Sequence, residues 1–327
     1  MKDFSYLRAA SVDAALQAAA LPGAMLLAGG TTLIDLAKCG VTEPETLVDI
    51  THLKGLNSIE VGERGATIGA LARMGHVADH GDIKSRFPAV SEALWQAASA
   101  QIRNMATIGG NLMQRTRCPY FRDPANFPAC NKREPGSGCS AIGGVTRGHA
   151  VLGTSNACIA MYPGDLAVAL VAFDAVVHLG LRQVPVDDFF LLPGTTPNRE
   201  HAIEPGEMIT AIEIPGSASA RRSTYLKIRD RQSYEFAAAS AAVGVEFEAD
   251  GRTIRDLRVA LGGVATKPWR ARAAEDALKG KVLEPDAVRA ASLLAVEGAV
   301  DHGANHYKIE LAPRVVARAI LKLGETA

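Results

Sequence analysis

Short apolar runs alternate with amphipathic stretches over the first third of the chain. Met25–Ala28 and Leu47–Ile50 have the length and composition of buried strands. Alternating residues on either side of Glu63–Gly65 predict a β-hairpin. Ser11 precedes the periodic run Val12–Ala20, and its hydroxyl is a typical N-cap. Further helices are predicted at Leu33–Lys38, Arg73–His80 and Ser91–Ala100.

Regular patterns return in the second half of the chain. Strands are predicted at Val176–Leu179, Met208–Ile214, Tyr225–Arg229, Ala237–Glu248 and Ile254–Leu261, and helices at Asp165–Asp174, Arg270–Leu278, Pro285–Glu297 and Ala312–Leu323. Three strands followed by three helices at the C-terminal end predict an α+β domain.

No periodicity is visible between Leu112 and Ala157. A loop of this length without secondary structure is uncommon unless it is functional or disordered. We therefore expect something other than a hydrophobic core to order this segment.

Composition narrows the classes of function. The chain has 327 residues, enough for two or three domains, with 48% hydrophobic and 21% charged residues. Its 35 basic and 35 acidic residues create no net field for nucleic acid or an anionic membrane. The longest apolar run, Leu166–Leu181, is interrupted by Asp174 and His178, so no membrane span is expected. Met1–Ser5 does not resemble a secretory signal, and none is expected within this chain.

Four of the five cysteines fall in the segment without periodicity: Cys118, Cys130, Cys139 and Cys158. Their spacings of 11, 8 and 18 intervening residues include no tight pair of the kind that structural zinc sites use. An iron–sulfur cluster tolerates wider spacing. A disulfide is not expected in a reducing compartment, and unrelated buried thiols remain an alternative.

The neighbours of these cysteines favour a cluster. Glycines leave backbone N–H groups free to approach sulfur, and basic side chains offset negative charge. These residues are Gly136, Gly138, Gly143, Gly144, Lys132, Arg133 and Arg147.

Two glycine-containing segments predict a dinucleotide site. Leu26–Leu33 carries Gly29 and Gly30 between a predicted strand and a predicted helix, where backbone can approach a diphosphate. Ala106–Asn111 repeats the arrangement with Gly109 and Gly110. Each could also be an unliganded turn or bulge. No G-x-S-x-G, H-E-x-x-H or P-loop motif is present.

Together these segments resemble the FAD-binding subunits of the molybdenum hydroxylases, the family of xanthine dehydrogenase and carbon monoxide dehydrogenase. Ala28–Leu33 matches the A-G-G-[HTQ]-[ST]-L motif of the family, and Thr107–Asn111 matches T-[IL]-G-G-N. Asp165 lies in a P-x-D element, and Lys227 matches the motif lysine near the flavin. The resemblance covers essentially the whole chain.

The resemblance implies an α+β fold: a two-lobed FAD-binding domain of the vanillyl-alcohol oxidase (PCMH) type in residues 1–220, and a C-terminal α+β domain like that of CO dehydrogenase flavoproteins in residues 222–327. The residues implied to bind FAD are Leu26, Leu27, Ala28, Gly29, Gly30, Thr31, Thr32, Leu33, Ala106, Thr107, Gly109, Gly110, Asn111, Asp165, Met208, Ile209 and Lys227.

Ordinary members pass from the T-I-G-G-N loop to the P-x-D element in a few residues, whereas about 50 intervene here. This insertion, at about residues 112–160, resembles that of the FAD subunit of bacterial periplasmic aldehyde oxidoreductase. It implies that Cys118, Cys130, Cys139 and Cys158 bind a [4Fe–4S] cluster.

The implied function is electron transfer in a molybdenum-dependent aldehyde oxidoreductase. A large molybdopterin-binding subunit and a small [2Fe–2S] subunit would complete a heterotrimer, and FAD would pass electrons to an external acceptor. No catalytic residue is expected in this chain. Export to the periplasm with a partner is favoured over a cytoplasmic location. The alternatives are a subunit of a 4-hydroxybenzoyl-CoA reductase-like or xanthine dehydrogenase-like enzyme, and a stand-alone FAD or iron–sulfur module.

Overall fold

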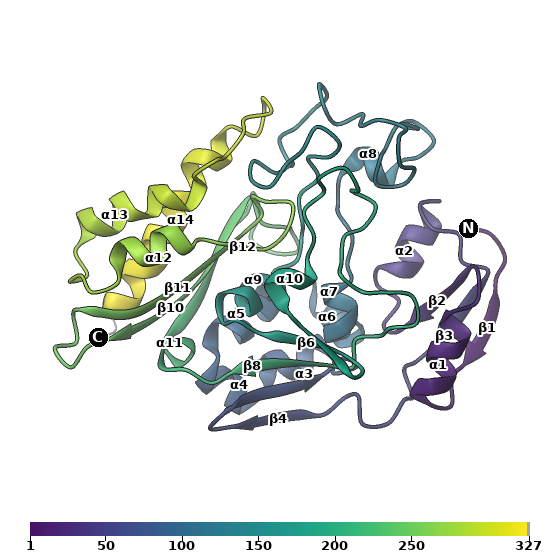
Figure 1. The fold of residues 1–327 in the computed structure, drawn as a ribbon, viewed down its shortest axis with the longest axis horizontal. Helices are drawn as coiled ribbons and strands as arrows, with labels where there is room; N and C mark the ends of the chain where they lie inside the picture. The colour runs from purple at the N-terminus through teal and green to yellow at the C-terminus, as the bar shows by residue number, and fades with distance from the viewer. Residues whose placement is uncertain (326–327) are drawn as a thin grey trace.

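The computed structural model describes residues 1–325 and contains three β-sheets arranged along the chain (Figure 1). The first sheet is parallel, with strand order β1-β3-β2. Its elements are β1 (Ser5–Arg8), α1 (Val12–Ala19), β2 (Ala24–Leu27), α2 (Leu33–Lys38) and β3 (Thr46–Asp49). The Ser11 hydroxyl accepts a 3.1 Å hydrogen bond from the Ala14 amide, which confirms the predicted N-cap. Strand β1 was not predicted, because all four of its residues are exposed and show no alternation of buried and exposed positions.

The second sheet has five antiparallel strands in the order β4-β5-β8-β6-β7. The strands are β4 (Ile59–Gly62), β5 (Gly65–Gly69), β6 (Val176–Leu179), β7 (Arg182–Pro185) and β8 (Ala211–Pro215). The helices of this part are α3 (Met74–Asp79), α4 (Gly81–Arg86), α5 (Pro88–Gln96), α6 (Ala100–Met105), α7 (Ile108–Leu112), α9 (Leu166–Ala172) and α10 (Val186–Phe189). Because β8 pairs with β5, a segment beyond residue 210 completes a sheet that begins before residue 70.

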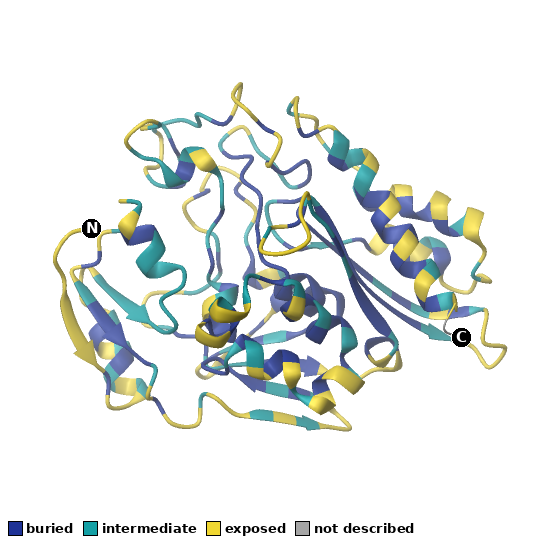
Figure 2. Cartoon of the chain, turned by 180° about the vertical axis from the view of Figure 1, so that it is seen from behind, coloured by how far each residue is buried: buried dark blue, intermediate teal, exposed yellow. Residues whose placement is uncertain are grey.

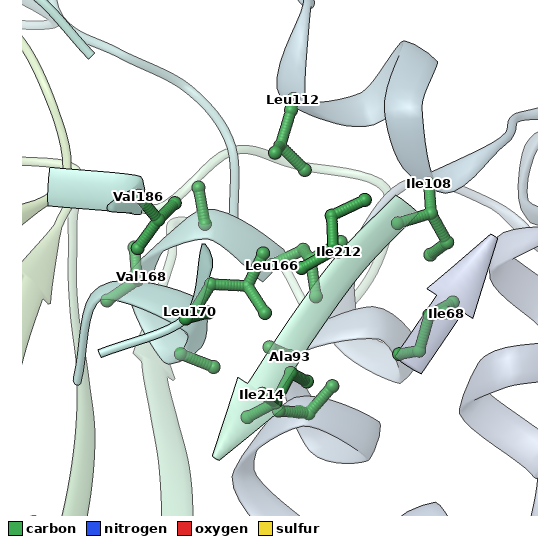
Figure 3. Packing of buried hydrophobic residues seen from close by; sticks show 14 of the residues in the cluster. Ile68, Ala93, Ile108, Leu112, Leu166, Val168, Leu170, Val186, Ile212 and Ile214 are labelled. Atoms are coloured by element: carbon green, nitrogen blue, oxygen red, sulfur yellow. The ribbon is translucent and has the colours of Figure 1, made fainter. Parts of the chain in front are cut away.

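The largest hydrophobic core lies between this sheet and its helices (Figure 3). Every residue of α9 is buried, and Leu166, Val168 and Leu170 pack in the same cluster as Ile212 and Ile214 of β8. The strand predicted over residues 208–214 is correct in its second half. Its first residues, Met208 and Ile209, are buried but precede β8.

The third sheet is antiparallel, with strand order β12-β11-β10-β9. Its strands are β9 (Ser223–Ile228), β10 (Ala239–Phe247), β11 (Ile254–Gly262) and β12 (Trp269–Arg270), and its helices are α11 (Ala218–Arg221), α12 (Arg272–Leu278), α13 (Pro285–Leu293), the 3₁₀ helix η1 (Leu294–Val296) and α14 (Tyr307–Glu325). Helix α14 begins at Tyr307, five residues before the predicted start at Ala312. A proline ordinarily marks a helix boundary, but Pro313 lies inside this helix.

The segment between α7 and α9 contains one short helix, α8 (Pro119–Arg122), so the predicted lack of regular structure is confirmed. It lies at the top of Figure 1, over the second and third sheets. Much of it is nevertheless buried (Figure 2). Leu152 forms a β-bridge with Ala265, and Asn305 Nδ2 donates to the Ala150 carbonyl at 2.9 Å. The insertion is therefore held against the C-terminal sheet and its helices.

The mixture of helices and strands matches the α+β expectation. None of the helices within residues 1–325 has both the length and the apolar composition needed to cross a membrane.

Candidate functional site

The two predicted glycine loops meet in the structure. Gly30 has φ +71°, a conformation that suits glycine, at the turn from β2 to α2. A Cβ placed on Gly29 would lie 2.2 Å from the Met105 carbonyl oxygen, so the first loop touches the backbone that leads into the second. Thr107 caps α7, where its Oγ1 accepts a 3.2 Å hydrogen bond from the Gly110 amide. Both loops therefore adopt fixed backbone geometries that depend on their glycines.

A cavity of about 530 Å³, here called the glycine-loop cavity, opens where these loops meet. Its walls comprise Thr31, Thr32, Asp35, Met74, Ala97, Ala98, Ile102, Ala106, Gly110, Asn111, Gln114, Arg117, Arg122, Pro163, Asp165, Arg231, Tyr234, Glu235 and Phe236. Three buried polar atoms on its walls have no partner among the described residues: Asn111 Oδ1, Arg117 Nε and Arg122 Nη1. Buried polar groups are ordinarily hydrogen-bonded, so these atoms fit a polar ligand.

Two arginines bring positive charge to this cavity. Arg117 and Arg122 both pair with Asp35 of α2, at 3.3 Å and 2.5 Å. Burial lowers the pKa of Arg117, which nevertheless stays protonated because an arginine starts from such a high value. One carboxylate facing two guanidinium groups leaves an excess of positive charge for an anionic ligand. Neither arginine was predicted as a site residue, although Arg117 directly precedes Cys118 and Arg122 follows it by four positions.

Asp165 lines the cavity and belongs to a buried network behind it. Its Oδ2 lies 2.8 Å from Lys227 Nζ, and its Oδ1 accepts a 2.6 Å hydrogen bond from the Tyr225 hydroxyl. Lys227 also donates to the Gln96 carbonyl at 3.1 Å. Burial raises the pKa of Asp165, while Lys227 and Tyr225 oppose that shift. Lys227 is absent from the cavity wall, so its contact with a cofactor stays a prediction, and the structure links it to the wall through Asp165.

The structure separates the residues predicted to bind FAD into groups. Those on the cavity wall are Thr31, Thr32, Ala106, Gly110, Asn111 and Asp165. Gly29, Gly30, Thr107 and Gly109 shape the two loops, together with the neighbouring Leu26, Leu27, Ala28 and Leu33. Met208 and Ile209 are buried in two different hydrophobic clusters and are absent from the wall. Their contact with a cofactor stays a prediction.

The four clustered cysteines converge on a second, smaller cavity, here called the cysteine cavity. Its walls comprise Cys118, Tyr120, Phe121, Ala129, Cys130, Lys132, Cys139, Ser140, Ala141, Cys158 and Ala160. Cys118 precedes α8, Cys130 and Cys139 face each other in an antiparallel bridge, and Cys158 lies in a second bridge with Ser155. All five cysteines are free thiols, and Cys39 lies apart, as the C-cap residue of α2.

Burial governs the chemistry of these thiols. It raises the pKa of Cys118 to about 12 and also raises the pKa of Cys158, where the nearby Lys132 opposes the shift. Such thiols stay protonated unless a metal or a cation stabilises the thiolate. Within residues 1–325, no three side chains of His, Cys, Asp or Glu are placed as ligands of one metal ion.

The glycines beside the cysteines were expected to leave their backbone N–H groups free to approach sulfur, and this is wrong for three of the four. The Gly136 and Gly138 amides donate to Asn131 Oδ1, at 3.1 Å and 2.9 Å, and the Gly144 amide donates to the Ala141 carbonyl. These N–H groups are therefore occupied in turns and are not free for sulfur.

The basic residues of the insertion have three different positions. Lys132 reaches the cysteine cavity and pairs with Glu200 at 2.9 Å. Arg133 donates to the Tyr120 and Phe121 carbonyls and so fixes the loop that carries Cys118. Arg147 pairs with Asp230 at 2.8 Å, outside the cysteine cavity.

Comparison with protein families assigns both parts of the chain. Residues 2–217 match the model of the FAD binding domain in molybdopterin dehydrogenase, and residues 224–323 match that of the CO dehydrogenase flavoprotein C-terminal domain. The first match spans the glycine loops, Asp165 and the cysteine cavity. FAD is therefore the cofactor of this domain, and the unpartnered polar atoms of the glycine-loop cavity fit it.

Similarities to individual proteins agree with these family matches. The aldehyde oxidoreductase FAD-binding subunit PaoB of Escherichia coli (strain K12) is 44% identical, over 98% of each chain. The glyceraldehyde dehydrogenase medium chain of Sulfolobus acidocaldarius is 31% identical, over 88% of this chain and 85% of its own. A solved carbon monoxide dehydrogenase from Hydrogenophaga pseudoflava superposes with a TM-score of 0.75 at 27% identity, over 99% of this chain and 98% of that chain. The fold, the cavity and the full-length matches show that the chain belongs to the FAD-binding subunits of the molybdenum hydroxylases, a family of oxidoreductases.

Proposed function

We propose that this chain is the FAD- and [4Fe–4S]-containing electron-transfer subunit of a molybdenum-dependent aldehyde oxidoreductase. A small partner with [2Fe–2S] clusters would deliver electrons, a large molybdopterin-binding partner would hold the substrate, and the three chains would form a heterotrimer. The names of the two relatives described above both refer to aldehyde oxidation, which supports this substrate class. We further propose that the chain reaches the periplasm together with a partner that carries the export signal.

The observation that carries the cluster assignment is the convergence of Cys118, Cys130, Cys139 and Cys158 on one cavity. In a [4Fe–4S] cluster each thiolate binds a different iron atom, so the four sulfurs surround the cluster instead of converging on a single ion. Lys132, on the same wall, offsets part of the negative charge that four thiolates bring.

The proposed FAD site uses the glycine-loop cavity. Bound FAD supplies the electron-transfer chemistry, and the protein holds and orients it. Gly29 and Gly30 let the first loop approach a diphosphate, and Arg117 and Arg122 complement its charge. Asp165 offers a carboxylate to the cofactor and is itself oriented by Lys227. We place the end of the FAD-binding domain at about residue 220 and the C-terminal domain at residues 222–327.

Iron, sulfide and flavin content, with low-temperature EPR after reduction, test the proposal. Wild-type protein should contain about four iron atoms and one FAD per chain. Cys139→Ser should remove the cluster signal and keep the flavin, because Cys139 lies outside the glycine-loop cavity.

Cys39→Ser is the matched control, since Cys39 is a free thiol that does not line the cysteine cavity. It should keep both iron and flavin. Flavin without iron in the wild-type protein would overturn the cluster assignment and leave the family assignment intact.

A further inference from the structure

A third cavity, of about 460 Å³, lies between the other two and is here called the middle cavity. It shares Arg117, Glu235 and Phe236 with the glycine-loop cavity. It shares Cys118 and Tyr120 with the cysteine cavity. A molecule bound in the middle cavity would therefore touch the walls of both proposed cofactor sites. Its volume is within the range of small-molecule sites.

Aromatic side chains surround the middle cavity. Tyr120, Phe127, Phe236 and Tyr307 all lie on its wall. Tyr120 and Phe127 meet edge to face with ring centroids 4.6 Å apart, and Tyr307 packs beneath the Arg147 guanidinium at 4.9 Å. Aromatic walls favour a flat ring as ligand, because stacked and edge-to-face contacts are both available to it.

Lys308 is the unusual polar residue of this cavity. It is 1% exposed, yet no carboxylate within residues 1–325 pairs with it. Its Nζ donates to the Gly263 carbonyl and lies 3.8 Å from Met161 Sδ. Burial lowers the pKa of Lys308 to about 8. An ammonium group has three N–H donors, so this residue has capacity to donate to a ligand oxygen.

His149 is the second buried polar residue on the wall, with 2% of its surface exposed. Its Nε2 lies 3.2 Å from Cys118 Sγ, and its buried Nδ1 has no partner among the described residues. The two carboxylates of the cavity are already engaged: Asp230 pairs with Arg147, and Glu235 accepts from the Arg231 amide. The groups left for a ligand are thus the Lys308 ammonium, one imidazole nitrogen of His149, and Arg117 Nε, which has no partner among the described residues and lies on the wall shared with the glycine-loop cavity.

We propose that the middle cavity binds a quinone-type electron acceptor, a flat ring whose carbonyl oxygen accepts a hydrogen bond from Lys308. His149 Nδ1 would be available to a hydroxyl of the reduced ring. Conversion of a quinone to a hydroquinone takes up two electrons and two protons, the number that one fully reduced FAD carries. A quinone would be the external electron acceptor that the proposed function leaves open, so this inference rests on the proposed function.

Binding of duroquinone to the oxidised, flavin-loaded full-length protein, measured by titration calorimetry, tests this inference. Its fully substituted ring does not add thiols, so the cysteines do not interfere. Gly148→Phe fills the cavity, because Gly148 lies on its wall and a Cβ there meets nothing within 4 Å. We expect at least tenfold weaker binding in this variant, and roughly fivefold weaker binding in Lys308→Met through the lost hydrogen bond.

Gly81→Phe is the matched control, since Gly81 is also exposed with open space around its Cβ position and does not line the cavity. It should bind duroquinone like the wild type. Equal affinity in Gly148→Phe would overturn the site, and equally tight binding of benzoate would overturn the ligand class. Iron and flavin are assayed separately on the same samples: quinone binding without iron would refute the cluster and support this site, whereas a loaded protein that binds no quinone would refute this site alone.

Discussion

Lys227 and Asp165 form an ion pair of 2.8 Å although 62 positions separate them in the chain, and both side chains are almost completely buried. The pair joins the first strand of the C-terminal sheet to the start of helix α9 in the FAD-binding part. Because Asp165 also lines the glycine-loop cavity, this single contact connects the wall of the proposed FAD site to the packing of the two parts of the chain.

Lys227→Met is therefore expected to damage both stability and FAD binding. It leaves a buried carboxylate without its counter-ion, which typically costs about 3–5 kcal/mol. Urea unfolding and flavin release from the same preparation measure the two effects. The double variant Lys227→Met/Asp165→Asn should recover part of the stability, and a double variant as unstable as the single one would contradict the pairing argument.

Gly29→Ala is expected to weaken FAD binding strongly. The added Cβ would lie 2.2 Å from the Met105 carbonyl oxygen, so the two loops must separate. Flavin retained after gel filtration measures the effect, with thermal unfolding as a check of folding. Gly81→Ala provides the comparison, because its Cβ position is open. Full flavin occupancy in Gly29→Ala would show that the loop contact does not shape the cofactor site.

Stability should fall between about pH 6.5 and pH 4 through His201. This ring is buried against Phe189 and Phe190 and contacts the Leu112 carbonyl through Nε2 at 3.1 Å, and burial lowers its pKa to about 4. The unfolded chain binds a proton near pH 6.5, but the folded chain does so only near pH 4. The unfolded state therefore gains protons first as pH falls, which removes on the order of 3 kcal/mol across this window.

Denaturant unfolding of His201→Gln across that range checks this expectation, since the amide keeps a donor for Leu112 and does not titrate. The variant should show a flatter pH profile. His76→Gln, at an exposed histidine, should keep the wild-type slope. An unchanged slope in His201→Gln would assign the pH dependence to other groups.

Local patterns predicted much of the fold. The two glycine loops, the hairpin around Glu63–Gly65 and the strands β9, β10 and β11 of the third sheet depend on neighbouring residues, and each was visible in the sequence. Strand β1 was not, because its exposed residues carry no alternation. The short strand β12 was not visible either, and its Arg270 was predicted to begin a helix. Helix α7 was expected only as a loop or bulge, since its glycines concealed a helix capped by Thr107.

Only those parts of the site that are formed by residues close together in the sequence were predictable. Arg117 and Arg122 reach the glycine-loop cavity because the insertion folds back over Asp35, more than 80 positions away. The middle cavity is built from the insertion, the segment after β9 and the start of α14, and no spacing in the sequence joins those three. Lys227 and Asp165 were each identified through a family motif, but their pairing emerged only from the three-dimensional contact.

The insertion contains one four-residue helix, and most of its internal backbone hydrogen bonds close short turns, such as those from Arg133 to Cys130 and from Gly144 to Ala141. Four iron–thiolate bonds would close loops of 11, 8 and 18 residues, and so remove conformational entropy from the unfolded chain as cross-links do. Under the proposed assignment, iron is thus a folding element as well as a redox centre. Protein made without iron should be cut by proteases first within this segment, while the FAD-binding lobes and the C-terminal sheet resist digestion.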